Sequence, residues 1–329
     1  MFVYFAKRIF YLIPLAILIS IMSFVVIQLP PGDYVTTWEY NMISQGYKPT
    51  VEEIQLLKER YNLDKSFIEQ YFKWISNIVL HGDFGQSFTY NRPVSDILVE
   101  RVPRTIGITL AAIILQWIIA LPIGILSAVK KYSFFDYVFT FIGFIGISIP
   151  GFMFAIILVY TIYVNTGYAI TGLYSEAYKD APWDIYKFID LLKNVSVPLI
   201  VLSTSGAAVI IRILRSSMLD ELEKQYVVTA RSKGISELKI LFKYPFRIAI
   251  NPLISTIGWL LPAAVGGEVV ISKVLNIPTT GPVLLKALMG EDMYLAGGIL
   301  FILSILTIIG TLISDILLAL LDPRIRYEQ

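Results

Sequence analysis

The sequence contains no cysteine and a single histidine, His81. Cysteine or several histidines supply most transition-metal sites, and cysteine is also a common catalytic nucleophile. We therefore expect no metal site, no disulfide and no thiol chemistry, and we interpret His81 as a surface residue. The chain also lacks a GxxxxGK[ST] phosphate-binding loop. We expect no catalytic residue and interpret the chain as a protein that is not an enzyme by itself.

Charged residues are scarce as well. They make up 16% of the chain, against about 25% in soluble domains, whereas 56% of the residues are hydrophobic. Crossing a bilayer takes about 20 mostly apolar helical residues. The sequence therefore predicts an all-α multi-pass membrane protein with six transmembrane helices. The six apolar runs are Ile9–Leu29, Ile106–Val129, Tyr137–Tyr163, Val195–Ile213, Ile248–Ile271 and Leu295–Leu321.

The positions of lysine and arginine near the ends of these runs indicate an orientation, because such residues favour the cytoplasmic side. Basic residues precede the first run, follow the second and fourth, and follow the sixth. These ends are all on one side of a six-span chain. We expect both termini and the loop at 214–247 to be cytoplasmic. The first run is too long for a signal-peptide core and no cleavage site follows it, so we expect it to be retained.

The organisation along the chain follows from these runs. We expect a first transmembrane helix in residues 1–29, an external segment in residues 30–103, and a membrane core of helices 2 to 6 in residues 104–329. Within the external segment, apolar residues recur at spacings of three and four, which predicts two amphipathic helices. Thr50 followed by Glu53 is typical of a capping box at the start of the first.

The basic loop that follows the fourth run has the pattern of two short helices joined by a turn. Gly234 stands where a left-handed residue ends a helix, Ser236 is a suitable N-cap for the next one, and Ile235 is placed to pack on Ile240. Leu238, Leu241 and Phe242 then form an apolar stripe. A solvated basic loop or one that binds anionic lipid explains the lysines. The stripe and the turn favour a protein partner instead.

The same loop resembles the EAA loop of permease subunits in binding-protein-dependent ABC importers. Val228 occupies the position of the glutamate that names that loop, so the resemblance rests on Ala230 and Gly234. It implies that the loop docks on a cytoplasmic ATPase. The coupling residues implied in this way are Thr229, Ala230, Arg231, Lys233, Gly234, Ile235 and Leu238.

Other stretches are similar to the peptide/nickel (oligopeptide/dipeptide) permease group and its B-type subunit: the N-terminal YFAKRIF to PPGD, residues 60–87, PVSDILVERVPRTIGITL, SIPGF at 148–152 and LLDPRIRY at 320–327. The resemblance implies the type I ABC importer permease fold in a prokaryotic inner membrane, with a short oligomeric solute, either an oligopeptide or an oligosaccharide. It also implies a second homologous permease, two ABC ATPases that hold ATP and Mg, an external solute-binding protein and membrane lipid, with no nucleic acid and no cofactor on this chain.

The fifth run is unusually rich in helix breakers, with two prolines and three glycines between residues 252 and 267. Broken backbone at membrane depth is tolerated where it lines a cavity or is buried in protein. The candidate pathway residues are therefore Trp259, Gly266, Gly267 and Glu268. For Glu268, a structural role is as well supported as a role in the pathway. An ion-coupled secondary transporter is the alternative function, although no inverted repeat or pair of midplane acids supports it. An intramembrane hydrolase is disfavoured because the only histidine falls in the external segment.

Overall fold

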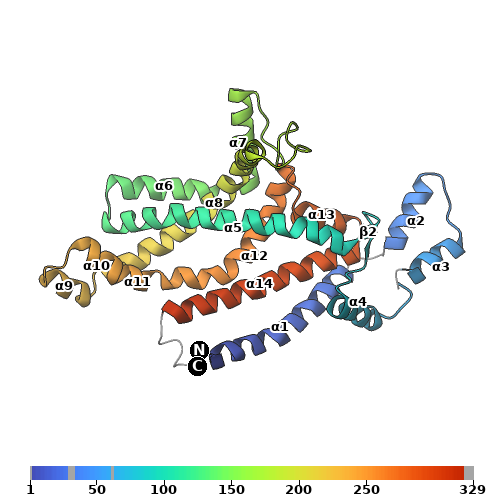
Figure 1. The fold of residues 1–329 in the computed structure, drawn as a ribbon, viewed down its shortest axis with the longest axis horizontal. Coiled ribbons are helices and arrows are strands. Elements are labelled where there is room, and N and C mark those ends of the chain that lie inside the picture. The colour runs from blue at the N-terminus through green and yellow to red at the C-terminus, as the bar shows by residue number, and fades with distance from the viewer. Residues whose placement is uncertain (1, 29–33, 61–62, 322–329) are drawn as a thin grey trace. The chain divides into compact units, whose positions relative to one another are not determined.

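The computed structural model describes residues 2–28, 34–60 and 63–321. The described residues divide into two compact units, one drawn from residues 2–9, 106–277 and 307–321 (unit 1) and one from the described residues within 10–105 and from 278–306 (unit 2). The elements, all but β1 labelled in Figure 1, are α1 (Phe2–Gln28), α2 (Tyr34–Ser44), α3 (Val51–Arg60), α4 (Phe67–His81), β1 (Gln86–Ser87), β2 (Arg92–Pro93), α5 (Val94–Val129), α6 (Phe134–Ser148), α7 (Gly151–Thr166), α8 (Ile185–Leu222), α9 (Gln225–Ser232), α10 (Glu237–Lys243), α11 (Pro245–Ala249), α12 (Asn251–Val274), α13 (Thr280–Met289) and α14 (Met293–Leu321).

The helices agree with the predicted spans. Within the described residues, α5, α8 and α14 are each long and apolar enough to cross a membrane, and α6 with α7 makes a fourth span if that bent pair is counted as one. The two other predicted runs fall on α1 and α12, which are also helical, although some of their side chains lie outside the described set. The all-α prediction is confirmed.

The predicted run Tyr137–Tyr163 falls on two helices, α6 and α7. The helix breaks between Ser148 and Gly151, and α6 and α7 are bent by 104° from each other (Figure 1). Pro150 explains the break, because it carries no N–H and forces the preceding residue out of the helical region. Ile149 accordingly has an extended backbone, with φ −89° and ψ 122°.

The segment between α1 and β1 contains the two predicted helices, α3 and α4, and one helix that was not predicted, α2. The capping box at the start of α3 is confirmed: the backbone N–H of Thr50 donates to Glu53 at 2.8 Å, and the Glu53 N–H donates to Thr50 Oγ1 at 3.2 Å. α4 begins with a second such box, between Ser66 and Glu69. α4 ends at Gly82, which has the left-handed φ of +66° that the end of a helix favours.

The centre of unit 2 is a buried carboxylate, Asp292, at the start of α14. It accepts hydrogen bonds from the Ser87 hydroxyl at 2.6 Å, from the Thr89 N–H at 2.9 Å and from the Leu295 N–H at 3.2 Å. The last of these caps α14, while the first two hold the β1–β2 hairpin. We call these four residues the Asp292 cluster. Gly85, close to the cluster in sequence, has φ +88°. A Cβ atom at this position would lie 3.0 Å from the Tyr294 ring.

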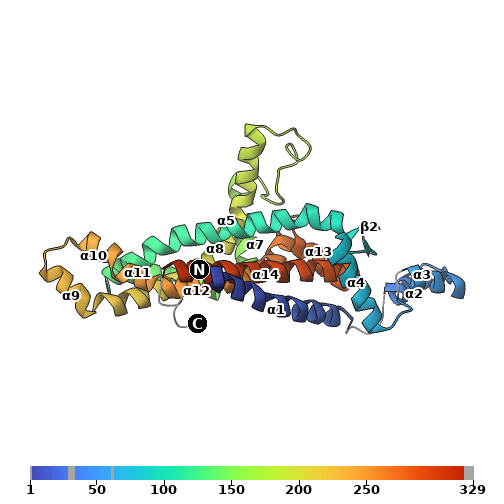
Figure 2. The same ribbon diagram turned by 60° about the horizontal axis from the view of Figure 1, so that its bottom comes forward.

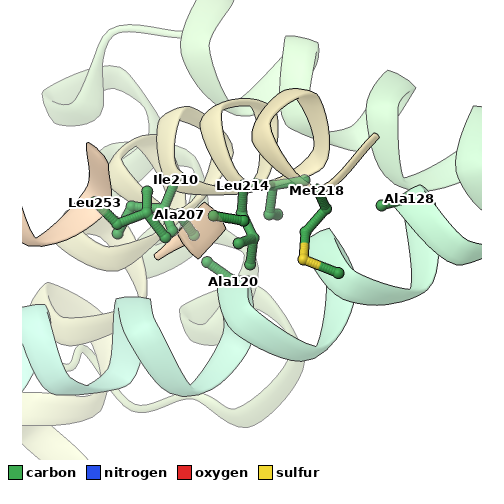
Figure 3. Close-up of a cluster of buried hydrophobic side chains, with 9 residues drawn as sticks. Ala120, Ala128, Ala207, Ile210, Leu214, Met218 and Leu253 are labelled. Carbon is green, nitrogen blue, oxygen red and sulfur yellow. The ribbon is translucent and has the colours of Figure 1, made fainter. Parts of the chain in front are cut away.

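The core of unit 1 is built around α8. Ala207, Ile210, Leu214 and Met218 on α8 pack against small residues of α5, Ala120 and Ala128, and against Leu253 of α12 (Figure 3). The small residues of α5 leave room for the larger side chains of α8.

Unit 1 also has an ion pair that joins α6 to α8. Arg215 donates two hydrogen bonds to the buried Asp136, at 2.7 and 2.8 Å. After α8 the chain folds into the short helices α9 and α10, and α11 follows them (Figure 2).

Candidate functional site

The predicted helix–turn–helix exists as α9, a turn at Gly234, and α10, which we call the α9–α10 hairpin. Gly234 has φ +71°, as predicted, and no atom lies within 4 Å of the position of a Cβ. Glycine is therefore required here by the backbone conformation and not by a lack of space. The turn is closed by the Gly234 N–H, which donates to the Arg231 carbonyl at 2.9 Å.

The hairpin has a small core of its own. Val227, Ala230 and Ile240 are buried together, and Ile235 packs on them, so the predicted contact of Ile235 with Ile240 is confirmed. Ala230 is only 5% exposed. Its methyl group therefore packs inside the hairpin, and its role in coupling stays a prediction. A charge at this position would unfold the hairpin, so such a variant cannot report on docking alone.

Two polar interactions fix the shape of the hairpin. Arg231 donates two hydrogen bonds to Glu237, at 2.9 and 3.2 Å, across the Gly234 turn. The Tyr226 hydroxyl donates to Glu221 at the end of α8. The pKa of Tyr226 is raised, mainly because the hydroxyl is buried and also because of this hydrogen bond. Ser236 is the N-cap residue of α10, as predicted, but its side chain makes no capping hydrogen bond.

The predicted apolar stripe divides into an inner and an outer part. Leu241 packs on the unit 1 core, whereas Leu238 and Phe242 are 72% and 54% exposed, and Val228 on α9 is also 44% exposed. Among the other predicted coupling residues, Thr229, Arg231 and Lys233 are exposed as well. The hairpin therefore presents apolar side chains held on a rigid turn, which is what a helix-in-groove contact requires.

Unit 1 also contains a cavity of about 480 Å³, lined by residues of α5, α6, α7, α8 and α12. Of the predicted pathway residues, Gly266 lines this cavity. Glu268 is not part of the lining: it is buried and accepts a hydrogen bond from Ser272 at 2.5 Å, which favours the structural interpretation of this residue. The surroundings of Trp259 and Gly267 are not among those that the structure describes. Their role in the pathway stays a prediction.

The sequence reasoning missed Gln116, which lines the same cavity from α5. Its side chain is 4% exposed. The signal was present in the sequence, because Gln116 is a lone amide within the apolar stretch AAIILQWIIAL. Polar side chains at membrane depth are rare and face protein or water. Among the described residues, no group of three or more His, Cys, Asp or Glu side chains is placed to hold a metal ion.

Two aromatic residues of the loop before α8 pack around a lysine. Lys187, which is buried, lies over the rings of Tyr174 and Trp183, 5.0 and 5.8 Å from their centroids, and donates to the carbonyl of Ala181 at 2.5 Å. These two aromatic side chains therefore form part of the fold.

The family described as "Binding-protein-dependent transport system inner membrane component" matches residues 120–327, and the corresponding N-terminal family matches residues 1–109. The chain is similar to the oligopeptide transport system permease protein AppB of Bacillus subtilis (strain 168), with 35% identity over 98% of this chain and 99% of that protein. It is also similar to the peptidoglycan transport system permease protein YejB of Agrobacterium fabrum, with 31% identity over 87% of this chain and 79% of that protein.

Proposed function

Because the chain belongs to the family of binding-protein-dependent transport system inner membrane components, we propose that it is one permease subunit of an ATP-driven importer for a short oligomeric solute. The names of the two relatives, oligopeptide and peptidoglycan transport, favour a solute of this kind, and an oligopeptide is the first candidate. The family is one of transport permeases. The similarity to AppB extends over 98% of this chain, which is consistent with a peptide-type permease.

The observation that carries the coupling part of the proposal is the exposed apolar pair on α10, Leu238 and Phe242. Each would bury a large side chain in a groove of an ATPase, worth about 1.5–3 kcal/mol per residue. The Gly234 turn and the bonds between Arg231 and Glu237 hold α10 in place before docking, which lowers the entropic cost of binding. Closure of two ATPase subunits on ATP then moves the hairpin.

The mechanism we propose is alternating access. An external solute-binding protein delivers the solute to the outer side, and a second homologous permease completes the wall of the pathway. ATP binding on the partner subunits favours one of two states of the permease pair, and release favours the other. In this arrangement the hairpin and both termini are cytoplasmic, and the segment at 30–103 is external.

Docking is tested by co-purification of the ATPases with charged variants of the exposed pair. Leu238→Asp and Phe242→Asp each put a charge where a groove would exclude water, so we expect the recovery of ATPase per permease to fall about tenfold or more. Lys239→Ala, on the same helix and also exposed, is the matched control and should recover normally. Normal recovery and solute uptake with both aspartate variants would exclude this surface as the docking site.

Orientation is tested with single cysteines, since the chain has none of its own. A cysteine at Lys58 should react with a membrane-impermeant thiol reagent in intact cells, and one at Lys233 should react only after the membrane is opened. Reaction at 233 in intact cells would reverse the proposed topology.

A further inference from the structure

The cavity of unit 1 contains one polar side chain whose hydrogen bonding is incomplete. Gln116 is almost fully buried, and its Nε2 has no hydrogen-bond partner among the described residues. Buried amide groups in folded proteins nearly always have partners, since an unpaired one lowers stability.

The position of Gln116 depends on a glycine on the facing helix. A Cβ at Gly206 of α8 would lie 2.4 Å from Gln116 Nε2 and 2.5 Å from Oε1, which is closer than side-chain atoms approach. Only glycine lets the amide lie across α8 at this point. Gly206 also lines the cavity, so the amide and the glycine form one wall together.

The remaining lining says what kind of molecule would fit. A volume of about 480 Å³ is within the usual range for small-molecule sites. The lining described by the structure has no charged side chain, and its other polar side chains are Ser205 and Thr256. The Thr256 hydroxyl already donates to the Leu253 carbonyl at 2.6 Å. The cavity therefore suits an uncharged, largely apolar group that carries one or two hydrogen-bonding atoms.

We propose that this cavity is a solute-binding site, in which the side-chain amide of Gln116 forms a hydrogen bond with a peptide group flanked by apolar side chains. Gly206 is a positioning residue, because it acts only through the placement of Gln116. The inference rests on the proposed function, since it names the site and the class of group that the importer would carry through it. A charged solute group would be left without a counter-ion there and is disfavoured.

The binding test uses a thiol placed in the cavity of the complete purified importer, in lipid. Val270 lines the cavity and is half exposed, and because this chain has no cysteine of its own, Val270→Cys introduces its single thiol, whose labelling is followed on this subunit. The probe is the tripeptide Ala-Leu-Phe, acetylated and amidated so that it is uncharged. We expect the probe to slow labelling of the cysteine at 270 and to leave Tyr168→Cys, in the external loop, unaffected.

The role of the amide is tested in the same background. Gln116→Leu has a similar size and no hydrogen-bonding group, so the probe concentration for half protection should rise about fivefold, as expected for the loss of one neutral hydrogen bond. Gly206→Ala should have a similar effect because its methyl group displaces the amide. Gly143→Ala is the matched glycine control: its Cβ would lie 3.6 Å from Ala208 Cβ, an ordinary contact, and protection should not change.

The outcomes separate this proposal from the proposed function. Unchanged protection in Gln116→Leu, equal protection at both cysteines, or labelling at 270 that is already blocked before the probe is added would each overturn the site. Peptide uptake by the complete importer would stand in all of those cases. An intact complex that carries no peptide of any charge would instead overturn the proposed function.

Discussion

The α9–α10 hairpin and the Asp292 cluster are both short turns held by a few polar bonds, but they distribute their side chains in opposite ways. In the cluster, the carboxylate is fully buried and the hydrogen bonds run inward, from Ser87 and Thr89 to Asp292. In the hairpin, the ion pair is at the surface and the large apolar side chain of Leu238 is exposed. The polar groups of the cluster are paired within the fold, whereas the hairpin leaves a large apolar side chain uncovered.

The largest expected effect is on the cluster. Asp292→Ala leaves the Ser87 hydroxyl and the Thr89 N–H buried without an acceptor, and it removes the cap of α14. We expect a loss of about 3–5 kcal/mol of stability. The measurement is thermal unfolding of the purified complex in detergent. Met289→Ala, at an exposed position of α13, should unfold close to the wild-type temperature. Equal melting of the two variants would mean that the cluster does not stabilise unit 2.

A smaller effect is expected at the turn of the hairpin. Gly234→Val forces a β-branched residue to φ +71°, at a cost of about 1–3 kcal/mol, and should tilt α10. We expect normal insertion with reduced ATPase recovery. Gly234→Asn is the matched control, since asparagine tolerates this conformation and should retain most of the recovery. If valine and asparagine recover equally, the left-handed turn is not what places α10.

The surface ion pair should contribute least to stability. Arg231 and Glu237 are 45% and 69% exposed, so solvent screens them, and we expect Arg231→Ala to cost only about 0.5 kcal/mol. A double-mutant cycle with Glu237→Gln measures the interaction of the pair itself. An interaction energy above about 2 kcal/mol would show that the pair is a core element of the hairpin, contrary to the contrast with Asp292.

The carboxylate of Glu53, in α3, can be titrated without any partner subunit. The pKa of Glu53 is lowered, first by the Thr50 backbone N–H and then by the Tyr47 hydroxyl. The capping box is therefore stabilising above the unfolded pKa of about 4.3, and the contribution is lost as pH falls through the lower folded value. Tyr47→Phe should raise the pKa of Glu53 in an NMR titration, and an unchanged value would show that the hydroxyl has no effect on it.

Features that depend on a few consecutive residues could be predicted from the sequence. Gly234, the capping box of Thr50 and Glu53, and the contact of Ile235 with Ile240 were all found where local rules put them. The burial of Ala230 was not foreseen, because the resemblance indicated a role for that residue without indicating the direction of its side chain.

Features that join distant parts of the chain could not be predicted. The bond between Ser87 and Asp292 links residues 205 positions apart, and no periodicity relates them. The placement of Gln116 against Gly206 likewise depends on how α5 and α8 pack. Pro150 did mark a break, but a proline does not determine the angle, and the 104° bend is set by the packing of α7 against α8 and α12.

The length of α8 has a mechanical consequence. Its 38 residues correspond to about 57 Å of helix, nearly twice the thickness of the hydrocarbon layer. Pro198 removes one backbone bond within it and makes a natural hinge. The part of α8 from Pro198 to Leu222 is about 36 Å long. A rotation of roughly 5° about Pro198 would move the end next to the hairpin by about 3 Å, while Gly206, nearer the hinge, would move by about 1 Å. The end of α8 next to the hairpin would thus move about three times as far as the cavity wall at Gly206.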